Sequence, residues 1–448
     1  MQHGTELREH AERLLDLARR AGADEAQVSA SHDREIKVGF ERNELSLSAS
    51  GEETSLRLRV HHQHRLGAAS TNSTDRHDLE RAVEAAMAMA SFSPPDEHLN
   101  LPFPAPLEER PDLWDESIVS VGPEQLRSMA EEFLRALRED ARVSIDSGNV
   151  SSELDESWLL NTHGIAVRER QTRLAWLGSG QGLDGDDITN FDYGGGMSYR
   201  LEGARERMLV DGRRMARQIA GTFGAGTGVS YKGCVLLSPR ALEELVLDPL
   251  ESHLSGLQVF YGKSNFTDDK LGTPVTSPLF SLEDDPTDPL LVGCTAWDSE
   301  GVPTSRRTFI ERGVLRLQME NAYSAKRRGR SLTGHCGFGL HGAKVASGET
   351  PLADLVSGRQ PLLVVHRFSG NVDAQSGDFS GVAKGSHLHA AGERRPISET
   401  MISGNLFAML RCIEGVSREV ETVENGYVAP WILFDGISVT AQDQVGRP

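Results

Sequence analysis

Prolines crowd into one short stretch of this chain: the 21 residues from Phe92 to Asp112 hold six of its 19 prolines. Proline fixes φ and has no backbone N–H, so such a stretch cannot form a continuous helix or a central strand. It favours an extended crossing segment instead. We therefore expect a boundary here, and we divide the chain into an N-terminal α+β module (residues 1–91), the crossing segment (92–112), a middle helix-and-strand region (113–230) and a C-terminal domain (231–448).

The module before the prolines has the pattern of a helix, antiparallel strands and a second helix. Apolar residues recur at helical spacing between Leu7 and Ala18, and again between Leu79 and Ala90. The run from Ser55 to Val60 alternates strictly between polar and apolar residues, which predicts a strand with one buried face. Shorter strands are expected around residues 27–31, 36–40 and 45–49.

The remaining chain changes from mixed to strand-rich. Helices are expected near residues 123–139 and 202–219, with strands at 143–145, 154–160 and 165–177 between them. Beyond residue 231 we expect short strands and loops, helices near 239–247 and 317–328, and buried strands at 362–366 and 431–434. The predicted fold class is α+β, with an N-terminal helix and antiparallel-sheet domain followed by a large β-rich C-terminal domain.

The charge balance excludes two classes of partner. The chain has 47 Lys and Arg against 66 Asp and Glu, a formal net charge of −19. Nucleic acids and acidic membrane surfaces attract basic proteins, so neither is an expected partner. The sequence has no run of about 18 apolar residues, and its N-terminus is charged where a secretory signal would be apolar. We expect a cytoplasmic protein.

No catalytic motif stands out. The stretch Gly256–Ser264 has one residue too many for a phosphate-binding loop, and Gly337–Gly342 matches GxGxxG without a following helix. The helical stretch Ala241–His253 carries acids and one histidine, but neither HExxH nor HExxxH. Two acidic clusters, at residues 184–187 and 283–288, lie among glycines and prolines and are expected to be solvated loops. These patterns assign neither a catalytic nor a metal-binding residue.

Several short phrases, in the same order, resemble the TldD/PmbA family, and specifically its PmbA branch, also called TldE. The resemblance spans nearly the whole chain. The phrases are Gly22–Ala26, Asp298–Thr304, Tyr323–Lys326, Thr333–His335, Gly377–Ser380, Pro396–Glu399 and Ile402–Leu406.

This resemblance implies a defined role. TldD subunits of the family are metallopeptidases with HExxxH on a helix and a cysteine near the C-terminus. TldE subunits lack these ligands and pair with TldD, and the heterodimer threads an already unfolded peptide through a narrow cleft. Here the corresponding helix, near residues 241–254, has apolar residues or proline at the ligand positions, and the tail at 424–430 has no cysteine. The resemblance thus implies a non-catalytic subunit without its own cofactor, with zinc or another divalent metal in a TldD-like partner.

Five polar residues within the family-like phrases are candidates for positions in a peptide cleft or an interface. An extended peptide can be held by main-chain hydrogen bonds at strand edges, which needs no catalytic side chain. The same residues could equally satisfy turns and buried backbone groups. Two other functions stay open: a homodimeric, metal-dependent peptidase with atypical ligands such as His335, His387 and His389, or a subunit recruited to a natural-product pathway. The five candidates are His335, Asp378, Ser380, Glu399 and Asn405.

Overall fold

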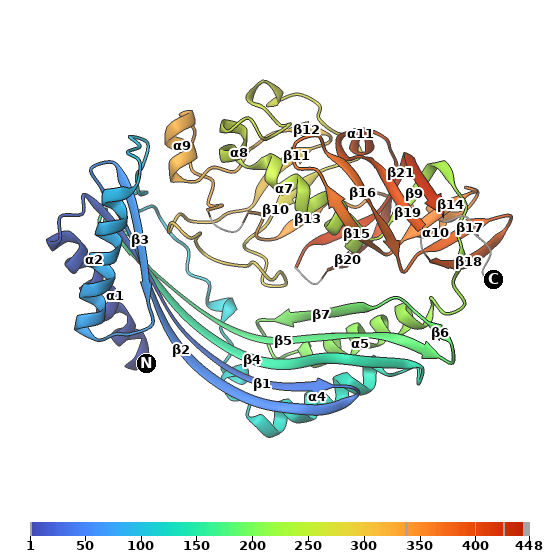
Figure 1. Ribbon diagram of the computed structural model, residues 1–448, viewed down its shortest axis with the longest axis horizontal. Helices are drawn as coiled ribbons and strands as arrows, with labels where there is room; N and C mark the ends of the chain where they lie inside the picture. Colours follow the sequence, from blue (N-terminus) through green and yellow to red (C-terminus); the bar gives the residue numbers. More distant parts are fainter. Residues whose placement is uncertain (1, 337–338, 399, 424–425, 442–448) are drawn as a thin grey trace.

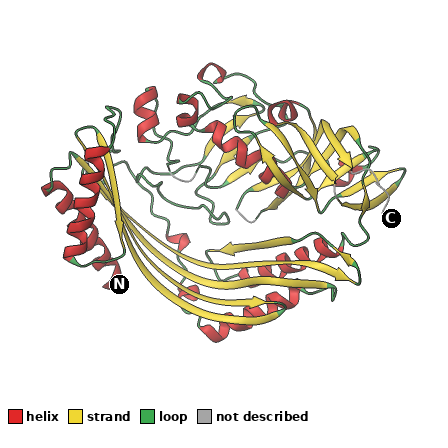
Figure 2. Ribbon diagram, in the orientation of Figure 1, coloured by secondary structure: helices red, strands yellow, loops and turns green. Residues whose placement is uncertain are grey.

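The chain forms a long, curved antiparallel sheet that carries helices, with a β-rich part above it (Figure 1). The computed structural model describes residues 2–336, 339–398, 400–423 and 426–441. Colouring by secondary structure shows how strands dominate both parts (Figure 2). The predicted α+β class, with an N-terminal helix and antiparallel-sheet domain before a β-rich C-terminal domain, is confirmed.

The curved sheet joins segments that lie far apart in the sequence. Within the described residues it has seven strands in the order β3-β2-β1-β4-β5-β6, with β7 also paired to β5. The central pair is β1 with β4, in unbroken register from Gln27 opposite Asn161 to Glu41 opposite Ser147. Residues 1–91 and 113–230 therefore share one sheet. Its strands are β1 Glu25–Glu41, β2 Glu44–His62, β3 Arg65–Thr71, β4 Val143–Asn161, β5 Ala166–Asp184, β6 Asp187–Ile188 and β7 Asp192–Ser198.

Several short strands expected from the sequence are parts of longer ones. The stretches at 27–31 and 36–40 both belong to β1, and those at 143–145 and 154–160 both belong to β4. The middle parts lack the alternation of a half-buried strand: residues 32–35 of β1 are partly or fully exposed, whereas three consecutive residues of β4, Val150, Ser151 and Ser152, are buried. Hydrogen bonding to neighbours on both sides keeps these residues in the strands.

Two helix pairs cover the two ends of the curved sheet. At one end α1 and α2 pack on a core that includes Val28, Leu56, Leu58 and Val60, and the expected stripe of α2 from Leu79 to Ala90 is buried there. At the other end α4 and α5 pack on a second core. The helices of this half are α1 Gln2–Arg20, α2 Arg76–Phe92, α3 Glu116–Val119, α4 Pro123–Leu137 and α5 Ala204–Ala220, with a short 3-10 turn η1 Pro111–Leu113.

The β-rich part is built around one long central strand, β21 Val428–Ala441. This strand pairs with β9, β13, β19 and β20, and its residues Trp431–Phe434 are buried as expected. The other strands are β8 Gly226–Thr227, β9 Tyr231–Leu237, β10 Leu282–Asp284, β11 Arg307–Glu311, β12 Val314–Leu315, β13 Ala343–Val345, β14 Leu362–Val365, β15 Arg367–Val372, β16 Asp378–Lys384, β17 His387–Ala390, β18 Glu393–Ser398, β19 Thr400–Asn405 and β20 Ile413–Thr422.

Short helices fill the connections of this part. The segment 239–254 is helical throughout and lies in the main apolar core. The helical elements are α6 Pro239–Leu242, η2 Glu243–Leu247 (π-helical), α7 Asp248–Leu254, α8 Gly256–Phe260, η3 Asp268–Lys270, α9 Ala322–Arg328, α10 Leu352–Val356 and α11 Leu406–Arg411.

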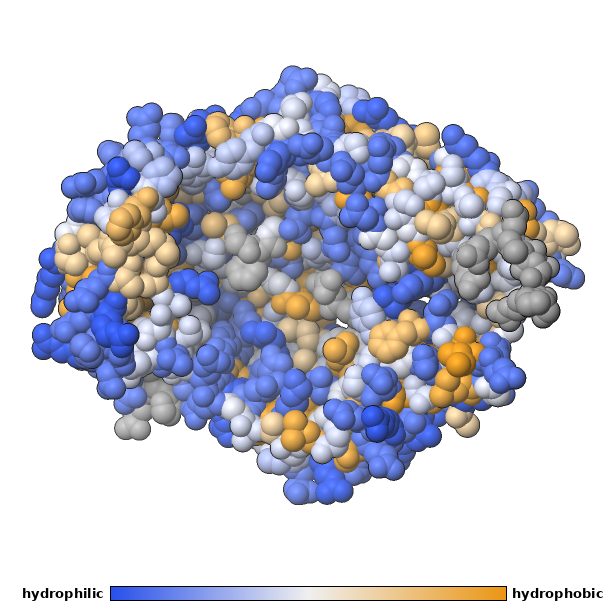
Figure 3. All heavy atoms as spheres, viewed as in Figure 1, coloured by the Kyte–Doolittle hydropathy of each residue, from blue (hydrophilic) through white to orange (hydrophobic). Residues whose placement is uncertain are grey.

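The proline-rich segment runs between the two parts and contacts both. Residues 93–110 contain neither helix nor strand. The Asn161 side-chain amide donates to the carbonyl of Pro102 at 2.9 Å, and the Tyr323 hydroxyl of α9 donates to Asp96 at 2.6 Å. The molecular face in Figure 3 is hollowed between the curved sheet and the β-rich part, and β7 lies at the sheet edge nearest to that part (Figure 1).

Candidate functional site

The helical segment 239–254 is the first element of the candidate site. Ser238 caps it by accepting a hydrogen bond from the Ala241 N–H at 3.1 Å. The segment widens to a π-helix at Glu243–Leu247, where the Asp248 N–H bonds to the Glu243 carbonyl five residues back. Pro249 follows at once and cannot donate to the carbonyl four residues before it. Wide turns of this kind are frequent at functional sites.

Acidic residues line one face of this segment at helical spacing, and protein groups already engage two of them. Glu244 accepts hydrogen bonds from the Phe368 N–H at 2.6 Å and from Arg367 Nε at 3.3 Å. Glu251 accepts one from the Tyr427 hydroxyl at 3.3 Å. Burial raises the pKa of both carboxyl groups. The hydrogen bonds lower it, but their effect is smaller than that of burial. Asp248, between them in sequence, lines a cavity together with Glu251.

His335 is one of the residues around that cavity, whose volume is about 330 Å³. Its side chain has no exposed area, and its Nδ1 lies 2.9 Å from the Thr333 carbonyl. Its Nε2 lies 3.0 Å from Asp284 Oδ2, and the Asp284 side chain is also fully buried. Both ring nitrogens therefore lie within hydrogen-bond distance of an oxygen atom. The expectation of a solvated loop at residues 283–288 is wrong for Asp284 and Asp285, which are buried.

Two of the other candidate residues meet where β16 and β19 pair. Asn405 caps α11 by accepting hydrogen bonds from two backbone N–H groups, and its Nδ2 donates to Asp378 Oδ1 at 2.8 Å. Ser380 lies two residues further along β16 and is exposed. His335 instead contacts Thr333, Asp284, Phe309 and His341, so the candidates fall into two groups. Glu399 lies outside the described residues.

The phrase Asp298–Gly301, which carries part of the family resemblance, docks the two parts of the molecule together. Glu300, 2% exposed, contacts Arg59 of β2 at 3.3 Å, and the Ser299 carbonyl accepts from the Gln27 side chain at 3.0 Å. Gly301 has φ +76°, and a Cβ there would lie 2.9 Å from side-chain atoms of Leu159 and Ile165. The sequence pattern alone gave no sign of this docking role, because all the partners are distant in the chain.

Asp298 fixes the shape of this phrase from within. Its carboxylate accepts three backbone hydrogen bonds, from the N–H groups of Glu300, Val302 and Cys336, at 2.9–3.0 Å. Burial raises the pKa of Asp298 to about 6, although these three hydrogen bonds lower it. The Asp298 carboxylate therefore stabilises a buried turn.

The donor groups of segment 239–254 do not fit a catalytic metal. Its one histidine, His253, is buried, and its Nδ1 accepts the Asn265 N–H at 3.2 Å. Among the described residues, no group of three or more His, Cys, Asp or Glu side chains is arranged to hold a metal ion. The histidines suggested as atypical metal ligands have other contacts. His335 lies beside Asp284, and His387 contacts the Gly221 carbonyl.

Three family models match this chain. They are the PmbA/TldA metallopeptidase domain 1 over residues 26–90, the central domain over 116–221 and the C-terminal domain over 230–441. The chain belongs to the PmbA/TldD family. It is 28% identical over 440 residues to "Metalloprotease PmbA" of Escherichia coli O157:H7, covering 94% of this chain and 93% of that protein.

Other members of the PmbA/TldD family are similar over comparable lengths. The PmbA homologue of Haemophilus influenzae is 26% identical over 442 residues, covering 97% of this chain and 96% of that protein. The crystal structure of TldE from Thermococcus kodakarensis has a TM-score of 0.82 at 23% identity and covers 96% of this chain and 100% of that one. This last likeness shows the shared fold. None of the described helices is long and apolar enough to cross a membrane.

Proposed function

We propose that this PmbA/TldE-family chain is the non-catalytic subunit of a heterodimeric metallopeptidase, paired with a TldD-like subunit that holds the divalent metal. The complex acts on small unfolded peptides, in peptide maturation or degradation, in the cytoplasm. The observation that carries the proposal is the chemistry of segment 239–254. Two of its acids and its histidine are bonded to protein groups, and it has no pair of histidines.

In this proposal the chain contributes backbone and shape to a peptide cleft. The edge strand β7 supports this role because within the described sheet it pairs with β5 alone. Its glycines let it lie close against β5 on its paired side: a Cβ at Gly195 would lie 2.1 Å from the Trp176 carbonyl oxygen. An extended peptide adds to such an edge through main-chain hydrogen bonds, which do not depend on the peptide's sequence.

The test compares the isolated chain with the chain co-expressed with a TldD homologue from the same genome. We expect the two to co-purify, the isolated chain to bind no stoichiometric zinc, and unfolded peptides to be cleaved only by the complex. Changing the glutamate of the partner's HExxxH motif to glutamine should abolish cleavage without separating the subunits. Stoichiometric metal together with peptidase activity in the isolated chain would overturn the proposal, and so would a failure to associate.

The candidate positions can be tested in the same complex. Ser380→Arg adds a long cation to the exposed face of β16, next to the Asp378 and Asn405 pair, and should weaken either association or peptide turnover. Ser48→Arg is the matched control because Ser48 is an exposed strand residue of the other sheet. If both variants associate and cleave peptides like the wild type, Ser380 lies in neither the cleft nor the interface.

A further inference from the structure

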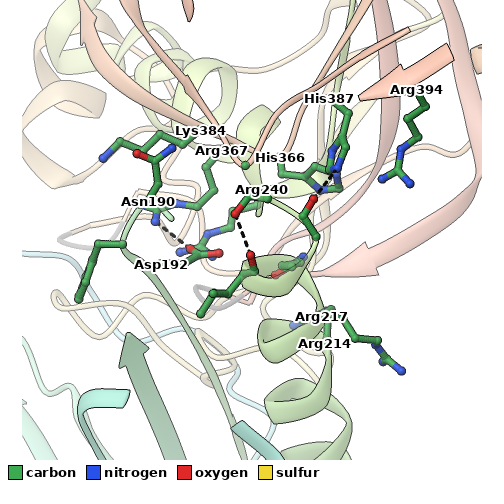
Figure 4. Close-up of a pocket in the computed structure, with 16 residues that line it drawn as sticks. Asn190, Asp192, Arg214, Arg217, Arg240, His366, Arg367, Lys384, His387 and Arg394 are labelled. Carbon is green, nitrogen blue, oxygen red and sulfur yellow. Dashed lines mark hydrogen bonds and ion pairs between the residues drawn. The ribbon is translucent and has the colours of Figure 1, made fainter. Parts of the chain in front are cut away.

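A basic cavity of about 250 Å³ lies where the curved sheet meets the β-rich part. Figure 4 shows its lining side chains, which come from α5, from the start of β7 and the residues before it, from α6, and from the strands β15 to β18 with their connections. Asp192 is the one acid among the lining residues of the described chain. This concentration of positive charge is unusual in a chain of net charge −19. The cationic lining residues are Arg214, Arg217, Arg240, Arg367, Lys384 and Arg394.

Nearby acids neutralise half of these cations. Arg240 and Arg367 contact Asp192 at 3.2 and 2.8 Å, and both guanidinium groups lie over the Tyr193 ring at 4.2 Å. Arg214 pairs with Asp211 at 3.0 Å. These residues form the wall of the cavity and hold its shape.

The other three cations have no acidic partner within the described part of the chain. They are Arg217 at the end of α5, Lys384 at the end of β16 and Arg394 on β18. Arg217 and Arg394 are exposed, whereas Lys384 is half-buried. Figure 4 shows Lys384 across the cavity from His387 and Arg394. An anion held near Arg217 and Arg394 would offset the positive charge of both.

His387 adds a buried ring nitrogen that lacks a hydrogen-bond partner among the described residues. It is 6% exposed, and its Nε2 lies 3.1 Å from the Gly221 carbonyl. A carbonyl only accepts, so Nε2 carries the proton and Nδ1 is the unprotonated nitrogen of the neutral ring. That Nδ1 is buried and has no hydrogen-bond partner. If Nδ1 took up a proton, it would become a donor to an anion in the cavity.

We propose that this cavity binds the oxyanion of a small molecule, a phosphate or carboxylate group, on the side lined by Arg217, Arg394 and His387. The volume is below the range of pockets for drug-sized ligands and suits a single anionic group. The bound anion touches both parts of the molecule, because Arg217 belongs to α5 and the other two residues to β17 and β18 of the β-rich part. Binding therefore ties the two parts together, and it is independent of any partner subunit.

The experiment is calorimetric titration of the isolated full-length chain with sodium phosphate at constant ionic strength, with chloride as the reference anion. Acetate, and a short peptide with either a free or an amidated C-terminus, distinguish a free anion from a peptide carboxylate. We expect saturable binding of phosphate or of a free carboxylate, and a higher melting temperature in the bound form. Heats and melting temperatures that match those in chloride for all these anions would overturn the proposal.

Two sets of variants locate the site. The double variant Arg217→Gln/Arg394→Gln should weaken anion binding at least tenfold while remaining folded, because neither arginine has an acidic partner to lose. Arg135→Gln, an exposed arginine on α4, is the control and should bind like the wild type. If the double variant binds as tightly as the control, the anion lies elsewhere and the proposal is wrong.

The pH dependence provides a separate readout. Three titratable or charged groups face His387: His366, whose ring centroid is 5.8 Å away, His389 on the same strand, and Arg394. Burial lowers the pKa of His387, and the charges of Arg394 and His389 lower it further. A bound anion opposes that effect, so the affinity for acetate, which stays ionised throughout this range, should rise as the pH falls from 8 to 6. His387→Phe should remove this dependence. Affinity that does not change with pH in the wild type would overturn the role of His387.

Discussion

Replacing Asp284 tests whether the buried pair with His335 is held by its hydrogen bonds. Asp284→Ala removes the acceptor of two donors, His335 Nε2–H at 3.0 Å and the Gly342 N–H at 2.5 Å. Both side chains of the pair are fully buried, so water cannot replace the lost contacts. Leaving two buried groups without their hydrogen-bond partner costs about 1–3 kcal/mol for each group. For a unit of the size of the β-rich part, this lowers the melting temperature by roughly 4–24 °C.

Asp284→Asn is the matched variant because the amide can keep both contacts. Its Oδ1 accepts from the Gly342 N–H, while its Nδ2 donates to His335 Nε2. The ring is then neutral and carries its proton on Nδ1, which still donates to the Thr333 carbonyl. We expect a loss below about 1.5 kcal/mol.

Differential scanning calorimetry of the wild type and the two variants measures these losses. Equal losses in both variants would refute the reasoning, because the charge of the pair and not its hydrogen bonds would then be decisive. A loss below about 1 kcal/mol for Asp284→Ala would show that the pair contributes little to stability.

Three further predictions concern other parts of the fold. Tyr323→Phe removes the hydrogen bond to Asp96 and should cost about 0.5–1.5 kcal/mol and speed proteolysis within residues 93–110, whereas Tyr261→Phe, at a largely exposed tyrosine, should not. Burial lowers the pKa of His366 to about 4, below its ordinary value of 6.5, so its neutral form stabilises the fold above pH 6.5. Up to about 3 kcal/mol should be lost as the pH falls toward 4, and chemical denaturation of His366→Phe should show a smaller loss. Gly67→Ala should lower the melting temperature because its Cβ would lie 1.9 Å from the Ala86 carbonyl oxygen of α2, whereas Gly51→Ala, with nothing within 4 Å, should not.

Local periodicity predicted the elements of this protein well where one face of an element is buried. The stripe of α2 and the alternating residues Leu56, Leu58 and Val60 of β2 lie in one core as expected. The middle of β1 was missed because it is a strand held by neighbours on both sides with little of it buried. Pairing of that kind depends on residues far along the chain, which no local pattern reports.

The candidate site was less accessible to sequence reasoning for the same reason. Asp284 looks like part of an acidic loop, and its burial follows from contacts with residues more than 50 positions away, His335 and Gly342. The basic cavity likewise collects Arg217 and Arg394 from elements that are distant in sequence. The order of the short motifs pointed to the family. The roles of single residues such as Asp298 and Tyr323 became clear only from their contacts in the folded structure.

The pairing of β1 with β4 sets an order of events on the ribosome. Synthesis delivers β1 first, and residues 42–142 must follow before β4 emerges to cover its free edge. During that interval β2 protects one side of β1 while the other side exposes unpaired N–H and C=O groups, which are prone to pair with other chains. We expect nascent chains that end before residue 143 to require a chaperone, and chains that extend past residue 161 to become resistant to proteolysis.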